Sequence, residues 1–456
     1  MNIIEELYKN KSHMIDLQIK KINFDMDYLY ILNIQTVSSS SFTNDFILEY
    51  FSNKKEFNKN DLLNIPSISY IEIKEKEVYD YLFNGFTILI YKTNILAFES
   101  KASLDRSIAE PTSEPTVKGP KDSFIENYNT NIGLIRKRIK DKNLYLRELT
   151  IGSVSKTKVC ILYLNNIVDK KLLNNVINKV SNIKTDKLLD TYYIKELIRK
   201  ENKSLFPTIK STEKPDMIAK SISEGKICII SENSNSALII PTFFLDYFYN
   251  QEDNYQKSFF VYFVRIIRLL ALFITIFLPS IYLSLITFDQ ATLPTDLLIN
   301  LSSQRAGVPF PALIEAFLLM FTFELLYEAD ELTPSLRGSA LSILGALILG
   351  ESAVSAGIVS PIMVIVVALT AICSIFFSYQ DFQSFIRFYR YSLMLLASMF
   401  GLIGILFGLL FIITNLCSIK SFDKPFLIPF APVIKKNKKY LIKNALIVQN
   451  TNKGEE

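Results

Sequence analysis

One stretch, from Leu301 to Tyr379, constrains this chain more than any other part of its sequence. It is apolar enough for the interior of a membrane, yet it carries five glutamates: Glu315, Glu324, Glu328, Glu331 and Glu351. Carboxylates at membrane depth are costly, and they usually face a protein interior or a watery path. The stretch is also rich in glycine, alanine, serine and proline, which allow close helix approach and broken helices. The sequence therefore predicts a helical bundle with acid at its centre.

The apolar residues divide the chain into two halves of different character. Hydrophobic residues make up 49% of the 456 residues, and the mean hydropathy of +0.23 is high for a soluble protein. The long apolar runs lie after Phe259, which favours a soluble first half and a membrane-embedded second half. The expected fold is an α/β N-terminal region of two similar subdomains followed by an all-α transmembrane bundle. The expected parts are subdomains at 1–106 and 123–256, a linker at 107–122, the bundle at 257–432 and a basic cytosolic tail at 433–456.

The sequence offers little of what enzymes and metal sites need. His13 is the only histidine, which removes His-based triads and zinc sites with several imidazoles. The cysteines at 160, 228, 373 and 417 show no Cys-x-x-Cys spacing, and we interpret all four as small buried hydrophobic side chains. Neither expected subdomain of the N-terminal region carries a Gly-x-Gly-x-x-Gly or Walker loop. We therefore expect no enzyme activity, no catalytic residue, no cofactor and no metal site.

Two similar patterns of elements are expected in the N-terminal half. The first has a strand over 28–32, helical spacing over 43–57, a helix over 78–83 that ends at Gly85, and a hairpin from 86–90 to 95–98. The second has a strand over 159–164, helices over 169–183 and from 215 to near Gly225, and a hairpin from 227–230 to 237–240. The order strand, helix, helix, glycine and hairpin occurs in both, which indicates an internal repeat.

Five apolar segments in the second half are candidates for crossing a membrane: Leu269–Phe288, Val308–Ala329, Gly338–Gly350, Ala356–Phe377 and Tyr391–Cys417. The start of the chain has no apolar region typical of a signal peptide. Arg265, Arg268 and the lysines after Lys420 place both termini on the inner side, so the number of crossings is even. We expect four crossings, with the short segment Gly338–Gly350 as a re-entrant element.

The acidic residues form the candidate pore or gate. On a helix over 318–332, Glu324, Glu328 and Glu331 share one narrow face, and Glu315 lies on the opposite face. A stripe of carboxylates attracts cations, so these four residues and Arg337 are candidate pore or gating residues. Two alternatives stay open. Arginines at 305, 337, 387 and 390 could neutralise the acids by pairing, or Glu328 and Glu331 lie past the membrane surface in solvent.

Small residues at four-residue spacing are candidates for close helix packing. They are Ser342, Ala346, Gly350, Gly357, Gly404 and Gly408. Packing within one subunit and packing between subunits are both compatible with this pattern.

A series of short segments resembles one known family. In the first half they are Ala109-Glu110-Pro111, Gly119-Pro120, NIGLIRKRI at 131–139 and TEKPD at 212–216. In the second half they are VPFP at 308–311, Glu315, GALILG at 345–350, AGIVS at 356–360, and Phe426 to Pro429 with Ala431-Pro432. Their order resembles that of the A subunits of GerA-type spore germinant receptors of endospore-forming bacteria. One departure is Tyr327-Glu328-Ala329-Asp330, where family members usually have Arg-Glu-Ala followed shortly by another arginine.

The resemblance implies a multi-pass protein of the spore inner membrane with a cytosolic two-subdomain region and cytosolic termini. It implies a transporter-like B subunit and a lipoprotein C subunit as partners, further copies of the chain, and membrane lipid. The net charge of +5 gives no nucleic-acid signal. The implied function is to trigger spore germination as an oligomeric ligand-gated ion channel. The alternative is a non-conducting scaffold that couples a transporter-like partner to downstream machinery.

Overall fold

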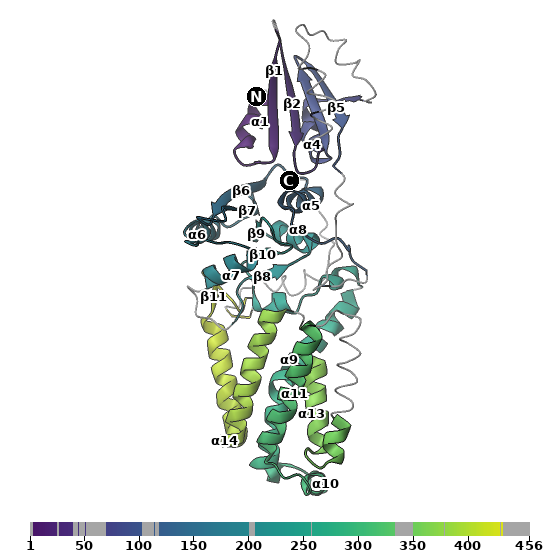
Figure 1. Ribbon diagram of the computed structural model, residues 1–456, viewed down its shortest axis with the longest axis vertical. Helices are drawn as coiled ribbons and strands as arrows, with labels where there is room; N and C mark the ends of the chain where they lie inside the picture. The colour runs from purple at the N-terminus through teal and green to yellow at the C-terminus, as the bar shows by residue number, and fades with distance from the viewer. Residues whose placement is uncertain are drawn as a thin grey trace, which may run out of the picture. The chain divides into compact units, whose positions relative to one another are not determined.

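The computed structural model describes residues 3–24, 27–39, 70–102, 118–199, 206–256, 258–332, 350–377, 379–428 and 430–431, and residues 44, 51 and 114. The chain forms two compact units. The first comprises Met1–Ser204, Thr208–Thr242 and Lys420–Lys424, and the second comprises Leu205–Pro207, Phe243–Ile419 and Pro425–Glu456. Figure 1 shows the sheets of the first unit and the long helices of the second.

The first five strands form an antiparallel sheet in the order β1-β2-β4-β5-β3. Alternate side chains of a strand point to opposite faces, so in β2 Leu29 and Ile31 enter one core while Leu32 and Ile34 enter the other. The elements are α1 (Ile3–Lys11), β1 (Leu17–Asn23), β2 (Tyr28–Ile34), β3 (Tyr70–Glu72), η2 (Glu75–Glu77), α4 (Val78–Phe83), β4 (Phe86–Tyr91) and β5 (Asn94–Glu99).

The next five strands repeat this topology. Their order, β6-β7-β9-β10-β8, is the same permutation as in the first sheet, and every pairing is antiparallel. The two sheets therefore confirm the expected pair of similar subdomains. The elements are α5 (Tyr128–Arg138), β6 (Leu144–Ile151), β7 (Thr157–Leu164), α6 (Lys170–Ser181), α7 (Thr191–Arg199), β8 (Lys210–Thr212), α8 (Pro215–Ser223), β9 (Ile227–Ser231) and β10 (Ala237–Ile240).

Equivalent glycines end the helix before the hairpin in each sheet. Gly85 follows α4 with φ of +82° and Gly225 follows α8 with φ of +84°. A side chain is strained in this left-handed conformation, which glycine adopts freely. A Cβ at Gly85 would also lie 2.7 Å from the carbonyl oxygen of Val37. The helix, glycine and hairpin order read from the sequence thus reflects one turn geometry used twice.

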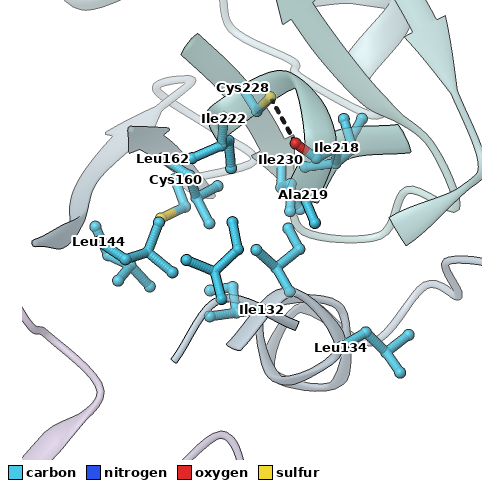
Figure 2. Packing of buried hydrophobic residues seen from close by; sticks show 14 of the residues in the cluster. Ile132, Leu134, Leu144, Cys160, Leu162, Ile218, Ala219, Ile222, Cys228 and Ile230 are labelled. Atoms are coloured by element: carbon cyan, nitrogen blue, oxygen red, sulfur yellow. Dashed lines mark hydrogen bonds between the residues drawn. The ribbon is translucent and has the colours of Figure 1, made fainter. Parts of the chain in front are cut away.

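The second sheet is covered on both faces. Helices α5 and α8 pack on one face and α6 and α7 on the other. Figure 2 shows the first of these cores, where Cys160 and Leu162 of β7 lie with Ile218 and Ile222 of α8. Burial raises the pKa of the Cys160 thiol to about 12, so this thiol stays protonated and packs as a small hydrophobe.

The two subdomains of the first unit are joined by a buried ion pair. Arg136 of α5 donates from Nε to Asp16 Oδ2 and from Nη2 to Asp16 Oδ1, both at 3.0 Å. The Arg136 side chain is 0% exposed and that of Asp16 is 4% exposed. Thr36 Oγ1 donates a further hydrogen bond to Asp16 at 2.9 Å. This bidentate geometry satisfies both carboxylate oxygens, as a buried pair requires.

The second unit is a helical bundle with short connecting elements. Its helices are α9 (Ser258–Thr287), α10 (Thr295–Arg305), α11 (Ala312–Leu332), α13 (Pro361–Ser374) and α14 (Gln380–Ser418). Short pieces are η3 (Phe244–Tyr247), η4 (Gln251–Tyr255) and η5 (Gln290–Thr292). Two short strands follow α14 in the chain, β11 (Lys420–Ser421) and β12 (Lys424–Pro425), and residues 420–424 belong to the first unit. Among the described residues, α9 and α14 are the helices long and apolar enough to cross a membrane by length and composition.

Helix α14 is two helices that reverse direction at Gly401. Gly401 has φ of 62° and ψ of −143°, which breaks the helical path. Asn415 Nδ2 donates to Tyr389 Oη at 2.6 Å although 26 residues separate them; in a straight helix they would lie roughly 40 Å apart. The interpretation of Tyr391–Cys417 as one crossing is therefore wrong, because this segment contributes to two antiparallel helices, and the count of four crossings loses its basis.

Other expectations for the second half have mixed outcomes. Helices α9, α11 and α13 lie within or across three of the expected segments. The expected burial of all four cysteines is wrong for Cys417, which is exposed on α14, while the other three are buried. The segment Gly338–Gly350, which we expected to be re-entrant, lies outside the described residues except for Gly350. The helix expected over 43–57 lies outside them except for residues 44 and 51. The finer domain boundaries stay a prediction.

Candidate functional site

The acidic residues of α11 occupy three different environments. Glu315 is 0% exposed, Glu324 is half-buried and Glu328 is exposed. The side chain of Glu331 lies outside the described residues, as does Arg337. Nearness on a helical wheel did not determine these environments. Glu315 contacts the start of α13 and Glu324 contacts α14, whereas Glu328 is exposed.

Glu324 is held by two arginines from the first part of α14. Its Oε2 lies 3.0 Å from Arg387 Nε, and its Oε1 accepts a hydrogen bond from Arg390 Nη2. Arg390 is 1% exposed at its side chain. Arg387 also lies 4.9 Å above the ring of Tyr327, one turn along α11. The pairing that the sequence left open as an alternative is thus present for Glu324.

Glu315 lies at the point where α13 begins. Its Oε1 accepts from the backbone N–H of Ser360 at 2.6 Å and from the Ser360 hydroxyl. Ser360 is the N-cap of α13 and Pro361 occupies the first turn, where its missing N–H costs nothing. A carboxylate at a helix N-terminus is favoured by the helix dipole. Arg305, the last residue of α10, places Nε 3.7 Å from the other oxygen.

Asp289, just beyond α9, fixes the reversal in α14. Its Oδ2 accepts from the backbone N–H of Leu402 at 3.0 Å and from the Ser284 hydroxyl at 2.6 Å. Leu402 begins the returning part of α14, so the carboxylate caps a helix N-terminus supplied by a distant part of the chain. A Cβ at Gly401 would lie 2.8 Å from this oxygen. Sequence reasoning missed Asp289; the paired signal was an acid directly after one apolar run and a glycine inside another.

Asp253, which precedes α9, forms ion pairs with both arginines that we expected at the inner surface. Arg268 contacts it through Nη1 at 2.8 Å and Nη2 at 2.9 Å, and Arg265 Nε lies 3.4 Å away. Asp253 is 6% exposed. These arginines therefore connect η4 to the first half of α9, and they place positive charge at one end of the bundle.

The candidate packing residues fall into two groups. A Cβ at Gly404 would overlap the carbonyl oxygen of Leu396, and one at Gly408 would overlap the side chain of Leu393. At Gly350 and Gly357 the nearest atoms would lie at ordinary distances of 3.7 and 3.6 Å. Ser342 and Ala346 lie outside the described residues. The close contacts at Gly404 and Gly408 are between the two parts of α14, within one chain.

Replacing Gly404 by leucine is expected to destabilise the α14 reversal. Overpacking of this kind typically costs about 1–3 kcal/mol, and here the obstructing atom is backbone, so we expect the upper end. The thermal midpoint of the purified protein in detergent and its yield should both fall. Gly307→Leu is the matched control, because among the described residues no atom lies within 4 Å of a Cβ there. Equal melting temperatures for the two variants would contradict the packing argument.

Among the described residues, no group of three or more His, Cys, Asp or Glu side chains could hold a metal ion. The buried carboxylates of this part of the chain are paired with arginines or serving as helix caps. The charged contacts connect neighbouring helices inside a largely apolar bundle.

Comparison with known proteins gives consistent matches. The family model described as Bacillus/Clostridium GerA spore germination protein matches residues 2–454. Spore germination protein KA of Bacillus subtilis (strain 168) is 37% identical over 366 residues, covering 79% of this chain and 67% of that protein. The uncharacterized membrane protein YfkQ of the same strain is 33% identical over 411 residues, covering 88% and 80%. A crystal structure of the N-terminal domain of the A subunit of the Bacillus megaterium spore germinant receptor GerK3 is 22% identical with a TM-score of 0.39, covering 53% of this chain and 94% of that one.

Proposed function

The chain belongs to the family of Bacillus/Clostridium GerA spore germination proteins, and we propose that it is the A-type membrane subunit of a nutrient germinant receptor. In this proposal it resides in the spore inner membrane with a transporter-like B subunit and a lipoprotein C subunit. The match over residues 2–454 carries the proposal. The apolar helices α9 and α14 and the name of the relative YfkQ as a membrane protein support the location.

The proposed mechanism is an oligomeric channel that opens when the receptor binds a nutrient. Carboxylates at 315, 324 and 328 lie on a helix of a largely apolar bundle. Charged side chains inside a membrane usually line an ion pathway or pair with one another. Glu328 supports the first use, because it is exposed and forms no ion pair with the described residues. Further copies of the chain would complete the path around it.

A non-conducting scaffold is the second candidate. The pairing of Glu324 with Arg387 and Arg390 favours it, because a neutralised carboxylate supplies no net field for passing cations. In this case the charged contacts transmit movement from a transporter-like partner to downstream germination machinery.

Reconstitution separates the two candidates. The chain is purified with its B and C subunits, placed in liposomes loaded with a potassium-sensitive dye, and exposed to amino acids, sugars and nucleosides one at a time. Nutrient-dependent flux that disappears when this chain is omitted supports the channel. Nutrient binding without flux at any tested concentration supports the scaffold.

We expect both ends of the helical unit on the same side of the membrane. Phe244, before α9, donates its backbone N–H to the carbonyl of Phe426, after α14, at 3.0 Å. The chain therefore enters and leaves this unit at one end, and α10 follows the far end of α9. In a Cys417→Ser background, cysteines placed at Ser258 and Asn437 should react with an impermeant maleimide from the same side. A cysteine at Ser303 on α10 should react from the other side; labelling of all three from one side contradicts the arrangement.

A further inference from the structure

Three complementary polar atoms meet in the interior of the helical unit. Glu315 is 0% exposed and uses Oε1 for both contacts with Ser360. Within the described part of the chain its Oε2 makes no hydrogen bond, and Arg305 Nε at 3.7 Å lies beyond hydrogen-bond reach. That Nε–H is itself buried and donates to no acceptor among the described residues.

Tyr282 supplies the third atom from α9. The residue is 8% exposed, and its hydroxyl has no partner that meets both the distance and the angle of a hydrogen bond among the described residues. Ser360 is the strongest polar neighbour of this hydroxyl, and the charges of Glu315 and Arg305 are near enough to act on it. One anionic acceptor, one cationic donor and one hydroxyl therefore converge from α11, α10 and α9. Buried polar groups in native proteins find partners, so three unsatisfied atoms in one place point to a common one.

We propose that Glu315 Oε2, Arg305 Nε and Tyr282 Oη bind one buried water molecule at the N-terminal end of α13. The partner must accept from the arginine and donate to the carboxylate, and water does both. A metal or ammonium ion is disfavoured because Arg305 already carries the countercharge 3.7 Å from Oε2. An anion is disfavoured by the carboxylate itself. The three atoms offer a bound molecule two to three hydrogen bonds, which is the number that buried waters usually make.

The water would add α9 and α10 to the hydrogen-bonded contact that Glu315 of α11 already makes with Ser360 at the start of α13. It links α9 and α10 to the carboxylate that caps α13, so a displacement of Arg305 would loosen the cap at Ser360 as well. This assignment does not depend on whether the bundle conducts ions. It concerns hydration of an otherwise apolar core, and it holds for a channel or for a scaffold.

Radiolytic hydroxyl labelling tests the site directly. A brief X-ray pulse converts bound water to hydroxyl radical in place, and the radical modifies the adjacent side chain even where bulk solvent has no access. The full chain in lipid nanodiscs is pulsed in the presence of a scavenger that quenches radicals from bulk water. Tyr282 should be modified at least several-fold faster than Tyr389, which is 2% exposed and whose hydroxyl already bonds to Asn415 at 2.6 Å. Equal, low rates for the two tyrosines overturn the proposal.

The variant Glu315→Leu separates this water from any other. Removing the acceptor should reduce Tyr282 labelling to the level of Tyr389 while labelling of the exposed Tyr192 stays constant. Unchanged Tyr282 labelling in this variant would show that Glu315 does not hold the water and would overturn the assignment. If Glu315→Leu fails to fold, Arg305→Met removes the donor instead, with the same expected loss and the same contrary outcome.

Discussion

Replacing Arg136 by methionine is expected to lower the free energy of unfolding of the first unit by about 3–5 kcal/mol, the usual cost of breaking a buried ion pair. Methionine keeps much of the aliphatic volume, so the loss arises mainly from Asp16. That carboxylate is 4% exposed and would keep only Thr36 as a side-chain partner among the described residues. Without its countercharge, a buried carboxylate destabilises the folded state, because nothing offsets the loss of its hydration.

The same helix provides a matched control. Arg138 lies on α5 two residues after Arg136 and forms an ion pair with Asp122. The side chains of Arg138 and Asp122 are 22% and 20% exposed. Arg138→Met should therefore cost at most about 1 kcal/mol. The chain has no tryptophan, so unfolding is best followed by pulse proteolysis in urea, reading the band of the first unit. Equal losses for the two variants would show that the fully buried pair contributes no more than a half-buried one.

A double variant isolates the pair from the volume change. Asp16→Leu combined with Arg136→Met removes both charges, and apolar replacement of a buried pair is often neutral. We expect the double variant to be more stable than Arg136→Met alone. A double variant less stable than either single one would mean that the residues act through other contacts.

Local sequence patterns predicted the elements that are apolar and regular. The strand 159–164 lies within β7, the helix over 169–183 contains α6, and both glycine-ended helices with their hairpins are confirmed. Helix α1 and strands β1 and β6 were not predicted, because charged and polar residues interrupt their periodicity. In β6, for example, Arg147 and Glu148 stand in the middle of the strand. Pairing along the whole of β7 stabilises it where its own pattern is weak.

Contacts between distant residues explain what the sequence could not supply. Asp289 caps Leu402, which lies 113 residues further along, and nothing local to Tyr391–Cys417 marks the reversal except a glycine of the kind common in membrane helices. Glu315 finds Ser360 at a separation of 45 residues and Asp16 finds Arg136 at 120. A helical wheel placed Glu315 and Glu324 on opposite faces, and the structure gives them different partners. It carried no information about which arginine each would meet.

Replacing Glu324 by glutamine is expected to reduce the amount of folded protein. The change keeps the shape but leaves Arg390, 1% exposed at its side chain, without its carboxylate. We expect a loss of about 3 kcal/mol, the low end for breaking a buried pair, because Glu324 is 18% and Arg387 is 34% exposed. The measurements are the level of the protein in the membrane fraction, its co-purification with the proposed partner subunits, and its melting temperature in detergent.

Glu328→Gln is the matched control on the same helix. Its side chain is exposed and, among the described residues, takes part in no ion pair, so protein level and melting temperature should be unchanged. If Glu328 lines an ion path, nutrient-dependent flux in liposomes should still fall, since the charge that attracts cations is gone. The two variants then fail in different assays, Glu324→Gln in stability and Glu328→Gln in flux. A normal level of Glu324→Gln with reduced flux would instead make Glu324 the pore residue and the arginine pairing a feature of the closed state. Normal level and normal flux in both would move any conducting path away from this face of α11.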